Sequence, residues 1–410
     1  MPTLNDFRRR HIILLIGENP LPNYVSAKLL LLPGGTAHLM CSTATHETAK
    51  RLGKMLESEG FQYQRIQILD EESDGFKISS ELGKHLETIG DLSIGLNYIG
   101  GTKVMAIHAY QTLLQSKPAA VFSYLNPRRL ELCIEIQENR HVISLPALDV
   151  ESITLEKILK LHNLKILDKQ IEPHNAAIAT EFTQFYTDQE LIKKWRKWCD
   201  NTLKQGDWKK EKFLQKRGTL YIADLPTSIR DVLNTHLGSN NEQIDLENAK
   251  TQCGFSSLKL LAKWLDGLWL EDYVLSHVQK TSSQYGLQEI GSSLKPQDPN
   301  KRNKSPKEER FELDVCFLRG YQLFGIACTT DYSRSLCKHK LIEACLRARQ
   351  LGGDEARIAL VCGYRDADDL REEVSLMGDD RKIEIFCSYD LEPEDFSEKL
   401  AAWIERNIEN

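Results

Sequence analysis

The chain has 410 residues, of which 41% are hydrophobic and 27% are charged, and its formal net charge is -6 at pH 7. This length is greater than a single hydrophobic core usually supports, and it predicts two or three domains of ordinary globular composition. A net negative charge excludes blanket electrostatic binding to nucleic acid, so any such contact needs a local basic patch.

None of the ten cysteines belongs to a Cys-x-x-Cys pair, which removes the usual zinc-ribbon and redox interpretations. Several cysteines fall within apolar stretches, where the reduced side chain acts as a small hydrophobe. The apolar run 11–17 is too short for a signal peptide, and no stretch approaches the length of a membrane span. We therefore expect a protein of the reducing cytoplasm that has no membrane partner.

Short apolar segments alternate with segments of helical spacing over residues 1–150. This alternation predicts an α/β fold with a Rossmann-like, mostly parallel sheet covered on both faces. Two later segments alternate apolar and polar residues and predict an appended antiparallel hairpin. The expected strands are 11–17, 37–43, 64–70, 92–98 and 119–125, the helices lie around 25–32, 45–59, 78–89 and 102–115, and the hairpin pairs 131–137 with 141–147.

The segment 151–285 predicts a helical connector that contains a small mixed or winged-helix-like region. Its basic stretch 193–198 carries Trp195 and Trp198 at helical spacing. This spacing favours a buried aromatic stripe with solvated lysines opposite. A groove for nucleic acid is the alternative, because bases stack on aromatic rings while Lys and Arg meet phosphates.

Residues 286–410 predict a second α/β domain, which begins with an apolar-poor loop or tether at 291–310. A hairpin through Gly320 follows the loop, and strands and helices alternate after it. The expected elements are strands 311–319 and 321–330, a helix over about 334–350, a strand at 358–364, a helix near 366–377, a strand at 383–389 and a closing helix from Asp395 onward.

Three expected strands of the first domain run into small or polar residues, at 17–20, 42–45 and 97–103. Ligands of open α/β sheets sit beyond the carboxyl ends of such strands. The first turn lacks Gly-x-Gly-x-x-Gly, which argues against an ordinary NAD site. Ser42 and Thr43 alone are also consistent with a helix cap.

The pair Gly100-Gly101 is the sharpest of these signals, because it is followed by Thr102 and Lys103 at the start of a helix. Glycines let a ligand approach the backbone, and a helix N-terminus favours an anion. The Gly-x-x-x-x-Gly-Lys spacing of a Walker loop is absent. The run therefore predicts a phosphate cradle, and a simple tight turn is the alternative.

Asn97 together with the Gly100–Lys103 run, following the fourth strand of a Rossmann-like domain, resembles the CARF domains of CRISPR-associated effectors. The resemblance covers about residues 10–150 and implies a homodimer that binds a cyclic oligoadenylate, tetra- or hexa-adenylate, across its two-fold axis. It implies that the phosphates meet Gly100, Gly101, Thr102 and Lys103 and that the bases lie near Glu18, Asn19, Pro20, Ser42, Thr43 and Thr45.

Two acids of the second half stand in apolar surroundings. Glu271 lies in an amphipathic helix, and Asp314 lies within an expected strand, where a carboxylate is costly unless it is paired or binds metal. Glu312 is two residues from Asp314 and points to the same face of the strand.

The helix–hairpin–helix–strand layout with these acids resembles the PD-(D/E)xK nuclease fold. The resemblance implies that Asp314 and Glu271 bind Mg²⁺ or Mn²⁺ and that the enzyme cuts single-stranded DNA or RNA. One departure is serious, because the expected acid-x-Lys on the second hairpin strand reads Ala327-Cys328-Thr329. Asp331 and either Lys338 or Lys340 follow soon after and are candidate migrated replacements, and a solvated helix face is the alternative for the two lysines.

The sequence therefore predicts a cyclic-oligoadenylate-activated nuclease effector of type III CRISPR antiviral defence. The alternative is a non-catalytic regulator that senses the nucleotide and binds nucleic acid or protein through a degenerate nuclease domain. A Rossmann enzyme with a mononucleotide cofactor is a third hypothesis. It is disfavoured because no catalytic His/Cys or Ser/His/Asp group lies near the strand ends. The size of the activator ring, the choice of DNA or RNA and degradation of the ligand by the sensor stay open.

Overall fold

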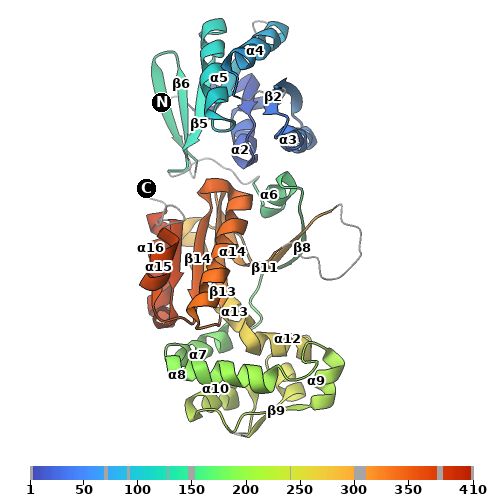
Figure 1. Cartoon of the computed structure of the whole chain (residues 1–410), viewed down its shortest axis with the longest axis vertical. Coiled ribbons are helices and arrows are strands. Elements are labelled where there is room, and N and C mark those ends of the chain that lie inside the picture. Colours follow the sequence, from blue (N-terminus) through green and yellow to red (C-terminus); the bar gives the residue numbers. More distant parts are fainter. Residues whose placement is uncertain are drawn as a thin grey trace.

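Two sheets and one helical module follow one another along the longest axis of the molecule (Figure 1). The structure is a computed structural model and describes residues 3–68, 73–89, 93–126, 129–145, 153–240, 242–299, 311–375 and 382–407. The first sheet lies at one end, the second lies in the middle, and the helical module lies at the other end (Figure 1).

The first sheet has seven strands in the order β3-β2-β1-β4-β5-β6-β7. The first five are parallel, and the last two form an antiparallel hairpin beside β5. This confirms the predicted Rossmann-like sheet and its appended hairpin. The strands are β1 (Arg9–Leu15), β2 (Leu31–Ser42), β3 (Gln62–Ile68), β4 (Ile94–Asn97), β5 (Val121–Asn126), β6 (Glu131–Ile136) and β7 (Asn139–Ser144).

Helices cover both faces of this sheet because successive apolar residues of each buried strand point to opposite sides. Ile12 and Leu14 of β1 pack in one cluster with α2 and α3, whereas Ile13 and Leu15 pack in another with α4 and α5. The helices are α1 (Leu4–Phe7), α2 (Leu21–Leu30), α3 (His46–Ser58), α4 (Gly75–Ile89) and α5 (Lys103–Ser116).

Three histidines form a hydrogen-bonded chain within the first domain. His38 Nε2 lies 2.9 Å from His11 Nδ1, and His38 Nδ1 lies 2.7 Å from His85 Nε2. Burial, with the neighbouring imidazoles, lowers the pKa of His38 from 6.5 to about 3. The three linked imidazoles are therefore neutral at pH 7, and they join β1, β2 and α4 at one place.

The second sheet has six strands in the order β15-β14-β13-β12-β11-β8. Strands β13, β14 and β15 are parallel, and the others are antiparallel. The hairpin through Gly320 is confirmed, with a φ of 58° at that glycine. The strands are β8 (Lys165–Gln170), β11 (Gln288–Gln297), β12 (Leu313–Arg319), β13 (Gln322–Thr329), β14 (Arg357–Cys362) and β15 (Ile383–Phe386).

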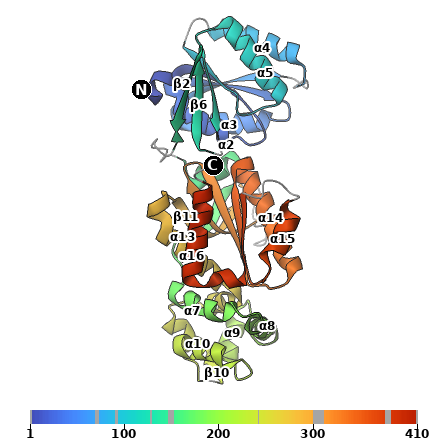
Figure 2. The same cartoon turned by 90° about the vertical axis from the view of Figure 1, so that its left-hand side faces the viewer.

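Four helices sandwich the second sheet. Figure 2 shows α14 and α15 on one side of the sheet and α13 and α16 on the other. The apolar clusters agree, since Cys337 and Leu341 of α14 pack with β14, whereas Tyr273 and Trp403 pack on the opposite face. The helices are α13 (Trp269–Tyr285), α14 (Arg334–Gly352), α15 (Ala367–Ser375) and α16 (Pro393–Arg406), and α6 (Leu155–Leu161) lies between the two sheets.

Two expectations for the middle of the chain are wrong. The expected loop at 291–310 begins instead as strand β11, and 300–310 lie outside the described residues. The polar composition of β11 did not indicate a strand. Because β11 pairs with a strand on each side, the hydrogen bonds of the sheet hold it, and this tertiary context overrides its low strand propensity. The connector was also expected to be helical at 165–170, but strand β8 lies there and joins β11 as the outer strand of the second sheet.

The helical segment after β8 is an insertion rather than a bridge between the two sheets. It leaves the second sheet after β8, lies at the end of the molecule far from the first sheet, and returns through α13 (Figure 1). Its elements are α7 (Ala176–Tyr186), α8 (Gln189–Trp198), a π-helical turn (Cys199–Leu203), α9 (Glu211–Arg217), β9 (Thr219–Tyr221), α10 (Thr227–Leu237), β10 (Gln243–Asp245), α11 (Leu246–Gln252), α12 (Leu258–Lys263) and a second π-helical turn (Trp264–Leu268).

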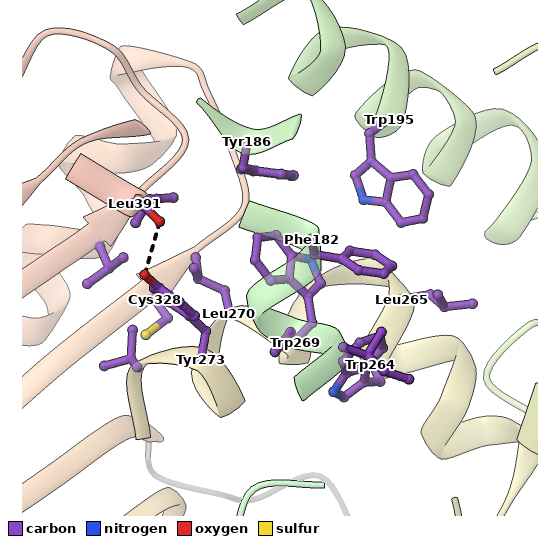
Figure 3. Close-up of a cluster of buried hydrophobic side chains, with 14 of the residues drawn as sticks. Phe182, Tyr186, Trp195, Trp264, Leu265, Trp269, Leu270, Tyr273, Cys328 and Leu391 are labelled. Atoms are coloured by element: carbon purple, nitrogen blue, oxygen red, sulfur yellow. Dashed lines mark hydrogen bonds between the residues drawn. The ribbon is translucent and has the colours of Figure 1, made fainter. Parts of the chain in front are cut away.

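Aromatic side chains form the core of this module (Figure 3). Phe182 contacts Trp195, Trp264 and Trp269, with ring centroids 5.2 to 5.5 Å apart. Trp195 and Trp198 are buried, which confirms the aromatic-stripe interpretation of the stretch 193–198. All ten cysteines are free and buried. Within the described part of the chain, no helix is both long enough and apolar enough to cross a membrane.

Candidate functional site

A cavity of about 570 Å³ lies between the first domain and the end of α14. The first domain contributes the predicted residues Glu18, Asn19, Gly100 and Gly101 to its lining. The opposite wall comes from later parts of the chain. That wall consists of His162, Tyr321, Arg349, Gln350, Gly352, Gly353 and Glu355, and the cavity is completed by Gly17, Pro22, Ile99 and Leu125.

The glycine pair of this cavity is required by close packing. A Cβ at Gly100 would lie 2.1 Å from the Leu15 carbonyl oxygen, and Gly101 has a φ of 71°, which favours glycine. Thr102 caps α5, because its hydroxyl accepts a hydrogen bond from Met105 N at 3.1 Å. The N-terminus of α5, with the positive end of the helix dipole, therefore lies next to this loop, which suits a phosphate.

The other predicted ligand residues are not part of the lining of this cavity. Lys103 is exposed at the first position of α5. Asn97 is fully buried, and its Nδ2 donates to Ser123 Oγ at 3.1 Å. Ser42 N donates to Thr45 Oγ1 at 3.0 Å, so these two residues stabilise their own loop. Pro20, Thr43 and Thr102 are likewise absent from the lining of this cavity. Their contact with a ligand stays a prediction.

The second site is built around Asp314 of β12. Its Oδ2 accepts hydrogen bonds from Cys328 N at 2.7 Å and from Lys340 Nζ at 2.8 Å, and Lys340 Nζ lies 3.1 Å from Oδ1. The cavity beside this pair measures only about 20 Å³, and Glu312, Glu343 and Lys340 help to line it. Asp314 is therefore held in a narrow site with a cation already against it.

Glu271 belongs to the same site. It comes from α13, and its Oε2 accepts a hydrogen bond from Ser293 Oγ of β11 at 3.0 Å. Burial, and then the charges of Asp314 and Glu312, raise the pKa of Glu271 well above its ordinary value. Burial also raises the pKa of Asp314, although Lys340 opposes that shift. The two acids thus share one low-dielectric environment and repel each other when both are ionised.

The structure distinguishes between the two candidate lysines. Lys340 binds Asp314, whereas Lys338 does not line the cavity. Residues two apart on a helix point about 200° away from each other, so both lysines cannot serve one site. Glu312 lines the cavity and also pairs with Lys295 at 3.4 Å.

Sequence reasoning missed two residues near Asp314. Ser293 was assigned to the expected loop, and the pairing of β11 with β12 brings it beside Glu271. Glu343 follows Lys340 by three residues on α14 and lines the same cavity. The i,i+3 spacing from Lys340 was the one signal that could have found it.

The donor set of this site fits one divalent cation of the magnesium type. Among the described residues, no three His, Cys, Asp or Glu side chains are grouped to hold an ion. Mg²⁺, however, is usually bound by one or two carboxylates, with water and substrate phosphates as its other ligands. Glu271 and Asp314 would supply two such carboxylates, and a cation between them would relieve their repulsion.

Comparison with known proteins gives matches by structure alone. No protein-family model matches the chain, and no curated protein matches it by sequence. The crystal structure of protein VC1899 from Vibrio cholerae matches with a TM-score of 0.74 and 15% identity, covering 98% of this chain and 100% of that one.

Two further solved structures are similar. Can2 from Sulfobacillus thermosulfidooxidans, in complex with cyclic tetra-adenylate, matches with a TM-score of 0.68 and 17% identity over 98% of this chain and 99% of that one. A type III CRISPR defence DNA nuclease activated by cyclic oligoadenylate matches with a TM-score of 0.50 and 15% identity over 87% of this chain and 46% of that one. From its first strand to its last helix, the chain therefore has the fold of VC1899 and Can2.

Proposed function

We propose that this protein is a cyclic-oligoadenylate-activated, metal-dependent nuclease effector of type III CRISPR defence that cuts single-stranded DNA or RNA. The observation that carries the proposal is the match to Can2 over nearly the full length of both chains, since that protein is in complex with cyclic tetra-adenylate. The glycine turn and the α5 N-terminus beside an open cavity supply the chemistry that such a ligand requires.

The proposed activator is a ring of phosphodiester-linked adenylates, probed first as cyclic tetra-adenylate. Backbone N–H groups at Gly100–Thr102 would bind its phosphates, and the Lys103 ammonium would add a point charge. A ring with internal symmetry suits the two-fold axis of a homodimer, so we expect one ring per dimer.

The proposed catalytic site comprises Asp314, Glu271 and Lys340, with Glu312 at its edge. Asp314 and Glu271 would hold Mg²⁺ or Mn²⁺, which would activate water and stabilise charge on the scissile phosphate. Lys340 replaces the lysine that β13 lacks, because its ammonium reaches Asp314 from the neighbouring helix. Burial keeps Asp314 and Glu271 in an environment where electrostatic interactions are strong.

A second candidate function follows from β13. Ala327, Cys328 and Thr329 offer no side-chain carboxylate there, and only the backbone N of Cys328 meets Asp314. This departure favours a nucleotide-sensing regulator whose second domain binds nucleic acid or protein without cutting. Incubation of single-stranded DNA and RNA with Mn²⁺, with and without cyclic tetra-adenylate, separates the two. Ligand-dependent products support the nuclease, and their absence supports the regulator.

Calorimetric titration of the full chain with cyclic tri-, tetra- and hexa-adenylate tests the sensor. We expect one of the rings to bind with a stoichiometry of one per two chains. Lys103→Ala should weaken that binding about tenfold or more, because a charge-assisted contact is lost. Lys117→Ala, at the opposite end of α5, is the matched control and should bind like the wild type. Failure of all three rings to bind contradicts the proposal.

A further inference from the structure

The cavity beside the glycine pair is composite, and α14 supplies much of its far wall. Arg349, Gln350, Gly352 and Gly353 come from the last turn of this helix and the residue after it. Arg349 brings a guanidinium to the side opposite the α5 N-terminus, and guanidinium groups suit phosphodiesters.

The end of α14 is fastened to both neighbouring parts of the molecule. A Cβ at Gly353 would lie 2.2 Å from Asn19 Nδ2, so the helix end directly contacts the Gly17–Asn19 loop. His162, just after α6, donates a hydrogen bond from Nε2 to the Leu351 carbonyl at 3.0 Å. Movement of the first domain against α14 therefore cannot leave the helix unaffected.

The same helix carries the ion pair that closes the second site. Lys340 and Arg349 are nine residues apart, which is roughly 13 Å along a continuous α-helix at about 1.5 Å per residue. Lys340 Nζ contacts both carboxylate oxygens of Asp314, at 2.8 and 3.1 Å. In a cavity of about 20 Å³, that contact occupies the space that a cation and a substrate phosphate would need.

We propose that α14 completes the nucleotide site through Arg349 and transmits its occupancy to Asp314 through Lys340. The inference rests on the proposed function and concerns its regulation. A phosphodiester bound between the α5 N-terminus and Arg349 pulls on the end of α14. The helix moves as a rigid element, and the Lys340–Asp314 contact opens. Binding of the ligand and opening of the ion pair are then coupled, and such coupling is reciprocal.

The first arm of the test measures ligand contact. Full-length Arg349→Ala is titrated with cyclic tetra-adenylate and should bind about tenfold more weakly, because a charge-assisted hydrogen bond is lost. Arg349→Lys keeps the charge and should recover part of the affinity. Arg334→Ala removes a positive charge from the other end of α14, where Arg334 pairs with Asp369, and should bind like the wild type. Equal binding by Arg349→Ala overturns the inference.

The second arm measures the coupling without any cleavage assay. If ligand binding opens the ion pair, removing the pair must favour binding. Lys340→Met should therefore bind cyclic tetra-adenylate about fivefold or more tightly, the lower end of typical coupling. The double variant Asp314→Asn, Lys340→Met leaves no unpaired carboxylate and should show the same gain. Lys338→Met, two residues away on the helix, should not.

The outcomes separate the inference from the function beneath it. Unchanged or weaker binding by both Lys340 variants overturns the transmission role of α14 while the sensor stands. A wild-type chain that binds none of the rings overturns the sensor and the inference together. Melting temperatures measured without ligand identify any variant that is unfolded. If Arg349→Ala is unfolded, binding by Arg349→Lys decides the first arm, and if Lys340→Met is unfolded, binding by the double variant decides the second.

Discussion

The two sites of this chain are built in opposite ways. The cavity beside the glycine pair measures about 570 Å³ and relies on a glycine turn and a helix N-terminus. The acid site is narrow, with a cavity of about 20 Å³, and relies on side chains that already neutralise one another. The larger cavity has room for a ligand, whereas the narrow site must widen before a cation and a phosphate can enter. The comparison teaches that, under the proposed function, the two sites need different things from a conformational change.

The largest expected effect is at the acid site. Asp314→Ala should lower cyclic-tetra-adenylate-stimulated cleavage on the order of 1,000-fold, because a metal-binding carboxylate contributes several kcal/mol of charge stabilisation. Cleavage of labelled single-stranded DNA and RNA with Mn²⁺ measures it. Binding of the ring should persist, since Asp314 does not line the larger cavity, and it should tighten if the ion pair is coupled to the ligand as proposed above.

Glu398→Ala provides the control for Asp314→Ala, because Glu398 is an exposed carboxylate of α16 in the same domain. It should cleave at the wild-type rate. If Asp314→Ala and wild type cut equally, the acid site is not the nuclease site, and the contrast between the two sites loses its functional meaning.

An intermediate effect is expected at the cavity beside the glycine pair. Gly101→Ala should weaken ring binding about tenfold, because a Cβ there would lie 3.1 Å from Leu15 Cβ and because φ is 71°, where alanine is strained. Gly60→Ala carries the same kind of strain, with a φ of 88°, but meets nothing within 4 Å. Calorimetry should find wild-type affinity in the Gly60 variant. Equal losses in both variants would mean that strain, and not the shape of the cradle, sets the affinity.

The last effect concerns stability rather than ligand binding or cleavage, and a change of pH should act on the two domains with opposite signs. Burial lowers the pKa of His38 to about 3 from 6.5, so the native state binds fewer protons than the unfolded state between these values. The stability contributed by neutral His38 is complete above pH 6.5 and is lost as pH falls. Lowering the pH from 7 to 5 should cost about 2 kcal/mol of unfolding free energy, at about 1.4 kcal/mol per unit.

Denaturant titration at the two pH values measures this loss, and His38→Asn should reduce it. Glu271→Gln supplies the contrast. The pKa of Glu271 is raised by burial, so protonated Glu271 stabilises the fold at low pH and that contribution is lost as pH rises. The glutamine variant should therefore gain stability relative to wild type at pH 8. A wild-type pH profile retained in His38→Asn would contradict the role of the histidine chain.

Local pattern predicted most of the fold because most elements here are amphipathic or uniformly buried. The parallel strands 37–43 and 119–125, the Gly320 hairpin and the helix after it all carry apolar residues at the period of their element. Strand β11 does not show this apolar period, since it contains Ser292, Ser293 and Lys295 and is held between two partner strands. The insertion was missed for a related reason, because the pairing of β8 with β11 joins residues more than a hundred positions apart.

The site residues show the same difference between those that the local sequence marks and those that only tertiary packing places. Gly100, Gly101 and Asp314 were predicted because each is locally unusual, as a glycine pair before a helix or an acid within an apolar strand. Arg349, Glu343 and Ser293 look ordinary in the sequence, and only tertiary packing gives them a place. The contact of Lys340 with Asp314 was among the alternatives, but helix phase alone could not choose it over Lys338 without the orientation of α14.

Asp272 fixes how the inserted helical module joins its host. Its Oδ2 accepts hydrogen bonds from Asn175 N at 2.9 Å and from Trp264 Nε1 at 2.7 Å, and its Oδ1 accepts one from Gln170 Nε2 at 3.1 Å. The point where the chain leaves the sheet and the point where it returns are thereby clasped by one carboxylate. A segment whose two ends meet can be gained, exchanged or lost in evolution without rerouting the strands on either side of it.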